Sequence, residues 1–69
     1  MGARWTDQDE RRVRAAEDRW YTGDTGPLEE LPALHRAVCS YRLGFGSSGI
    51  LDALDADERA QLFEAVAAR

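Results

Sequence analysis

The sequence predicts an all-α fold, a small bundle of three main helices plus a short helical turn. Apolar side chains recur every three or four residues along several stretches, which is the spacing of one helix face. Each stretch is bounded by capping residues, glycine or proline. The 69 residues predict one helical domain over 1–69, near the lower size limit for a fold without disulfides or metal.

The first helix is predicted from its start signal. Thr6 is placed to cap the helix, and Asp9, three residues later, completes a capping box. Val13, Ala16 and Trp20 then continue one apolar stripe. The segment TGDTGP ends the helix, because its glycines and proline favour turns.

The second helix is expected to begin near Pro27 or Pro32, since proline is tolerated in a first turn and not in a helix interior. Its apolar stripe comprises Leu31, Leu34, Val38, Tyr41 and Phe45. A short strand over residues 38–43 stays open as an alternative, because AVCSYRL contains β-branched and aromatic residues. The all-α interpretation is preferred because no hairpin partner is visible.

The last third of the chain predicts two helical segments. The stretch GILDAL, residues 49–54, is long enough for one or two turns. Asp55 and Glu58 form a second capping box, which starts the final helix. The buried stripe of that helix is predicted to comprise Leu62, Phe63 and Val66.

The predicted core is thin for a monomer, so we expect the chain to associate with another protein or with itself as a homodimer. The core side chains expected from the stripes are Val13, Ala16, Trp20, Leu31, Leu34, Val38, Tyr41, Leu51, Leu54, Leu62, Phe63 and Val66.

The stretch GFGSSG has the glycine spacing of dinucleotide-binding loops. Those loops follow a buried strand and lie in a βαβ unit. Here the preceding stretch predicts a helix, and only 20 residues follow Gly49. We therefore expect no nucleotide or other cofactor, and interpret Gly44 as the left-handed residue that ends the second helix.

The composition of the chain argues against nucleic-acid and membrane partners. The net charge is −4 and the last third is its acidic part, which makes nucleic acid an unfavourable partner. All nine basic residues are arginine, as expected for a GC-rich bacterial or phage genome. A single cysteine suits a reducing compartment, and no apolar segment is long enough for a membrane span. We expect a soluble cytoplasmic protein that does not bind membranes.

His35 and Cys39 lie four residues apart and would share a helix face. Such a pair is the beginning of a metal site or a thiolate–imidazole site. The chain has no other histidine or cysteine, so both are interpreted as packing residues. We expect no catalytic residue, no metal ligand and no self-contained active site, and predict that the chain is not an enzyme.

The leading hypothesis for function is a small acidic regulatory or adaptor protein that binds another protein or itself. Trp20, Tyr21 and Phe45 lie at predicted helix ends and are the candidate partner-binding residues. One alternative is a helical DNA-binding module. Its arginines would be Arg11, Arg12, Arg14, Arg36 and Arg42. A further alternative is an accessory subunit of an enzyme.

Overall fold

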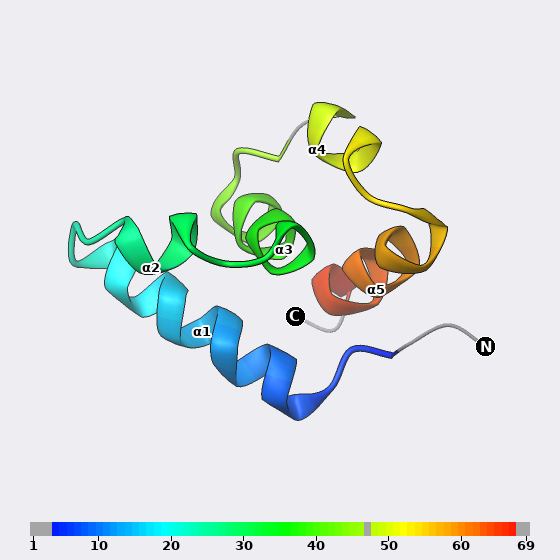
Figure 1. The fold of residues 1–69 in the computed structure, drawn as a ribbon. Coiled ribbons are helices and arrows are strands. Elements are labelled where there is room, and N and C mark those ends of the chain that lie inside the picture. The colour runs from blue at the N-terminus through cyan, green and yellow to red at the C-terminus, as the bar shows by residue number, and fades with distance from the viewer. Residues whose placement is uncertain (1–3, 47, 68–69) are drawn as a thin grey trace.

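The computed structural model describes residues 4–46 and 48–67, and over these residues it is helical without a strand. The all-α prediction is confirmed (Figure 1). The helices are α1 (Asp7–Tyr21), α2 (Gly26–Glu29), α3 (Ala33–Leu43), α4 (Ser48–Asp52) and α5 (Ala56–Ala67).

The helix α3 lies in the middle of the fold. It packs against α1 on one side and against α5 on another, as Figure 1 shows. The short helix α2 follows the turn after α1 and contacts both α1 and α3. The other short helix, α4, lies at the opposite edge of the fold from α1.

Both predicted capping boxes are present. At the start of α1 the Thr6 hydroxyl accepts from the Asp9 amide at 3.2 Å, and the Asp9 carboxylate accepts from the Thr6 amide at 2.9 Å. Before α5 the Asp55 carboxylate accepts from the Glu58 amide at 2.8 Å, and Glu58 accepts in return from the Asp55 amide at 3.0 Å. Each box satisfies two amides that would otherwise lack helical partners.

The two prolines start two different helices. Pro27 lies in the first turn of α2, and Pro32 immediately precedes α3. The strand alternative for residues 38–43 is wrong, because these residues lie inside α3. Proline therefore divides the stretch after α1 into a single turn and an 11-residue helix.

Left-handed glycines end both α1 and α3. Gly23 and Gly44 have φ angles of 93° and 94°. After α3 the amide of Phe45 donates to the Ser40 carbonyl at 2.9 Å, and the amide of Gly44 donates to the Tyr41 carbonyl at 3.3 Å. This pair of bonds is the Schellman motif, and it confirms the predicted role of Gly44.

The buried core is shared by α1, α2, α3, α5 and the segments between them. Its apolar members are Val13, Ala16, Leu28, Leu31, Leu34, Ala37, Val38, Cys39, Leu54, Leu62 and Ala65. Trp20, Tyr41, Leu51 and Val66 pack against this core but are only partly buried. The predicted burial of Phe63 is wrong, because 61% of this residue is exposed.

The error at Phe63 follows from helix geometry. Successive residues are about 100° apart on a helix, so Leu62 and Phe63 cannot both point to the centre of one core face. Leu62 and Ala65 are 1% and 0% exposed and define that face of α5. Phe63 therefore points outward.

Candidate functional site

The three predicted partner-binding residues lie together in the structure. The ring of Trp20 is 5.3 Å from that of Tyr21, nearly perpendicular at 83°, and 5.8 Å from that of Phe45. Trp20 is partly buried against the core, whereas 68% of Tyr21 and 49% of Phe45 are exposed. We call these three residues the aromatic cluster. It presents two exposed rings held by a third that is anchored in the fold.

The helix ends position the aromatic cluster. Trp20 and Tyr21 occupy the last turn of α1, and Gly23 turns the chain away directly after them. On α3 the Schellman motif at Gly44 reverses the chain, so that Phe45 turns back toward Trp20. Two local stop signals, 21 residues apart in sequence, thus bring the rings together.

Gly46 lies directly against the ring of Tyr41, where a Cβ atom would overlap the ring carbons. We expect Gly46→Ala to lower the free energy of unfolding by about 1–3 kcal/mol, because the Tyr41 ring or the Phe45 loop must move. Urea unfolding measures the change. Gly26→Ala is the matched control, since its Cβ would meet only ordinary contacts. Equal stability of both variants and the wild type would contradict the expectation.

Arg42 joins three helices. Its side chain is 2% exposed and donates to both oxygens of Glu10 on α1, at 2.7 and 2.8 Å. It also donates to the Ala65 carbonyl on α5 at 2.9 Å. A DNA-binding role would require an exposed guanidinium, so the structure removes Arg42 from the arginines proposed for that alternative.

The carboxylate of Glu10 is the centre of this network. Besides Arg42, it accepts from the Trp5 indole at 3.0 Å and from Arg14 at 2.8 Å. The hydrogen bonds from Arg42, helped by those from Trp5 and Arg14, lower the pKa of Glu10 from 4.5 to about 2. A second carboxylate, that of Glu17, is 7% exposed and lies 3.7 Å from the Arg42 guanidinium.

The other arginines of the DNA-binding alternative lie on two helices. Arg11, Arg12 and Arg14 are exposed on α1, and Arg36 is exposed on α3. Arg14 is paired with Glu10 at i,i+4, as its spacing predicts. Acidic pairs flank this run on α1, residues 9–10 before it and residues 17–18 after it, and partly offset its positive charge.

His35 and Cys39 do not form a reactive pair. Cys39 is fully buried, and burial is the main reason that the pKa of its thiol is raised to about 12. His35 instead lies 2.9 Å from the Asp9 carboxylate and 5.4 Å from the ring of Trp5. Partial burial opposes ionisation of Asp9, but bonds from the Thr6 backbone and His35 lower its pKa overall. The contact between Asp9 and His35 therefore helps to hold α3 against the start of α1.

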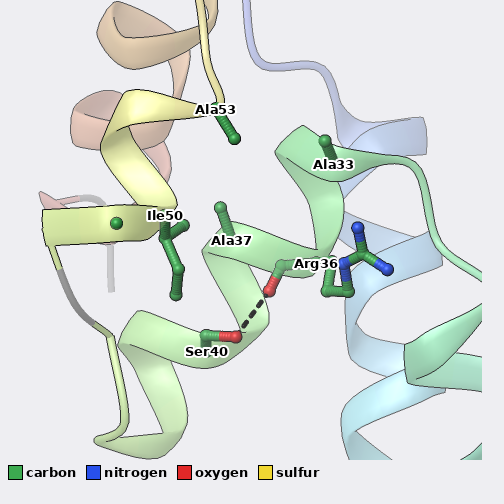
Figure 2. Close-up of a pocket in the computed structure, with 7 residues that line it drawn as sticks. Ala33, Arg36, Ala37, Ser40, Ile50 and Ala53 are labelled. Carbon is green, nitrogen blue, oxygen red and sulfur yellow. Dashed lines mark hydrogen bonds between the residues drawn. The ribbon is translucent and has the colours of Figure 1, made fainter.

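A groove of about 400 Å³ lies between α3 and α4 (Figure 2). Most of its lining residues are small, and the Ser40 hydroxyl donates to the Arg36 carbonyl within it. Its residues are Ala33, Arg36, Ala37, Ser40, Gly49, Ile50 and Ala53. Gly49, in α4, thus lines a helix–helix groove, and the element before GFGSSG is the helix α3.

Comparison with known proteins gives no relative for this chain: no family model matches it, and neither does any curated protein or solved structure. Within residues 4–46 and 48–67, no three histidine, cysteine or acidic side chains are grouped so that they could hold a metal ion. None of the described helices is long and apolar enough to cross a membrane.

Proposed function

We propose that this chain is a small regulatory or adaptor protein that binds a larger protein through the aromatic cluster. One observation carries the proposal: the exposed rings of Tyr21 and Phe45 both pack against the partly buried ring of Trp20, at 5.3 and 5.8 Å. Tyrosine and tryptophan are enriched among the residues that dominate binding energy at protein interfaces.

The geometry favours binding because the rings are already ordered. Packed aromatic pairs stabilise one another by about 0.5–1.5 kcal/mol, which restricts the rotamers of Tyr21 and Phe45 before a partner arrives. Side chains that are ordered in advance lose less entropy on binding. The Tyr21 hydroxyl adds a hydrogen-bonding group at the edge of the apolar surface.

Site-specific photocrosslinking tests the proposal. Benzoylphenylalanine replaces Tyr21, Phe45 or Phe63, one at a time, in cells of the native host. The use of arginine for all nine basic residues predicts that this host is bacterial. We expect positions 21 and 45 to crosslink to the same larger protein, identified by mass spectrometry. Phe63 is the matched control, because it is 61% exposed but belongs to α5. The same crosslink from position 63, or none from positions 21 and 45, would contradict the proposal.

The variants Tyr21→Ser and Phe45→Ser supply the quantitative test once that partner is purified. Each is expected to weaken binding at least ten-fold, because truncating an aromatic that is a binding hot spot costs about 2 kcal/mol or more, and about 1.4 kcal/mol is ten-fold. Their melting temperatures are expected to stay within a few degrees of wild type, since both rings are largely exposed. A partner that is an enzyme with altered activity in the complex would identify the chain as its accessory subunit.

A further inference from the structure

The outer face of α5 carries an apolar stripe of exposed side chains. Its members are Ala56, Ala60, Phe63 and Ala67. Their spacing of four, three and four residues places them on one side of the helix, opposite the buried Leu62 and Ala65. We call these four residues the α5 stripe, and Phe63 is its only large side chain.

Charged residues of opposite sign border the α5 stripe. Asp57 and Glu64, seven residues apart, lie along one edge, and Arg59 lies along the other edge, as a rotation of about 100° per residue requires. Asp57, Arg59 and Glu64 are all exposed. The helix therefore presents an apolar ridge with an acidic side and a basic side.

A groove of about 540 Å³ between α1 and α2 has the complementary pattern. Ala15, Ala16, Pro27 and Leu31 supply its apolar lining. On the α1 wall the lining includes Arg12 and Arg19, again seven residues apart, and on the other wall it includes Glu30. We call this the α1–α2 groove.

We propose that the α5 stripe of one molecule docks into the α1–α2 groove of a second copy of this chain. The two arginines and the two acids are each separated by two helical turns, about 10.5 Å along the axis. With the helices parallel, Asp57 faces Arg12 and Glu64 faces Arg19. Phe63 lies between these pairs and enters the apolar part of the groove.

The α2 wall of the groove is also complementary in charge to α5 when the helices are parallel. When the acidic edge of α5 faces α1, its basic edge faces the α2 wall, which brings Arg59 toward Glu30. Two of these charged residues also form ion pairs within one molecule, and those pairs compete only weakly with the proposed contact. Arg19 lies 3.4 Å from Asp24, and Arg4 lies 3.5 Å from Glu64, with Arg19 and Arg4 mostly exposed to solvent.

The proposed contact is head to tail, because the groove and the stripe are different surfaces of one chain. Such contacts form open chains, or rings where the rotation closes. The aromatic cluster takes no part in it, since none of its residues lines the groove. Self-association is therefore separable from the partner binding proposed above: Phe63→Ser is expected to weaken only the former, and Phe45→Ser only the latter.

Sedimentation velocity on the full chain tests the contact, between about 10 μM and 1 mM protein at about 50 mM salt, where surface charges are weakly screened. We expect wild-type assembly that grows with concentration and weakens as salt is added. The double variants Arg12→Glu/Arg19→Glu and Asp57→Arg/Glu64→Arg are each expected to assemble at least ten-fold more weakly. Mixing the two variants in equal amounts restores assembly, because each groove then meets a stripe of opposite charge.

Arg11→Glu, an exposed change on α1 that does not line the groove, serves as the charge control and keeps wild-type assembly. Circular dichroism verifies that every variant is folded. A monomer at all concentrations overturns the proposal, and so does a mixture that stays monomeric while its folded components are intact. Assembly that Asp57→Arg/Glu64→Arg abolishes and Arg12→Glu/Arg19→Glu leaves unchanged also overturns it, because α5 would then contact another surface.

Discussion

Replacing Arg42 with methionine is expected to lower the free energy of unfolding by about 3 kcal/mol, because removal of one partner leaves a buried carboxylate uncompensated. Glu10 would lose two hydrogen bonds, and Glu17, 7% exposed, would lose its nearest positive charge. A domain of this length is stabilised by roughly 3–10 kcal/mol in total. The single change therefore removes a large part of the stability of the fold.

Urea unfolding at neutral pH measures the effect, with thermal unfolding as a second measurement. About 3 kcal/mol corresponds to a melting temperature lower by roughly 12–24 °C in a domain of this size. Arg36→Met is the matched control, the same substitution at an exposed position of α3, and is expected to change the free energy by less than about 0.5 kcal/mol. Equal effects of the two substitutions would show that Arg42 does not tie the helices together.

The parts of the fold that local sequence determines were predictable. Both capping boxes and the left-handed Gly44 depend on residues within five positions of one another. The bonds they make require no other element, so the pattern of residue types is sufficient to locate them. Proline marks helix starts in the same way, but the sequence leaves Pro27 and Pro32 as alternatives for one helix, whereas each starts a helix of its own.

The wrong predictions concern residues whose burial or pairing is determined by packing between helices. Phe63 continues an apolar pattern, but only the position of α3 against α5 determines which side of that helix is buried. Arg42 resembles a surface arginine in sequence, because Glu10 is 32 residues away. Nothing local to Arg42 indicates that its partner lies on another helix. Leu28 carries no periodic signal, because a single turn such as α2 contains too few residues for an apolar pattern.

The residues of the candidate site could be predicted from the sequence, but their arrangement into one surface could not. The sequence indicates Trp20, Tyr21 and Phe45, because aromatic side chains at the helix ends of a small fold are incompletely covered. Tyr21 lies next to Trp20 on the same helix, whereas the contact of Phe45 with Trp20 depends on how α1 crosses α3. The same holds for the α1–α2 groove, whose walls are formed by residues from two helices.

The stability of the protein is expected to fall as the pH is lowered from about 5 to about 2, with Glu10 as a main cause. The pKa of this carboxyl is about 2 in the folded chain and 4.5 as its ordinary value. The unfolded chain therefore binds the proton first, so the stabilisation is fully present above about pH 5 and is lost as the pH approaches 2. A difference of this size corresponds to roughly 3 kcal/mol. Asp9, whose pKa is also lowered, adds a contribution of the same sign.

Glu10→Gln isolates the contribution of Glu10, because glutamine preserves the size of the side chain and removes its charge. Urea unfolding between pH 7 and pH 3 is expected to show the variant roughly 3 kcal/mol less stable at pH 7, with the difference shrinking steadily below pH 5. Asp18→Asn, at an exposed position of α1, is the control and is expected to run parallel to wild type. If Glu10→Gln also ran parallel to wild type, the ion pair with Arg42 would not be responsible for acid sensitivity, and the buried network would have to stabilise the fold by packing alone.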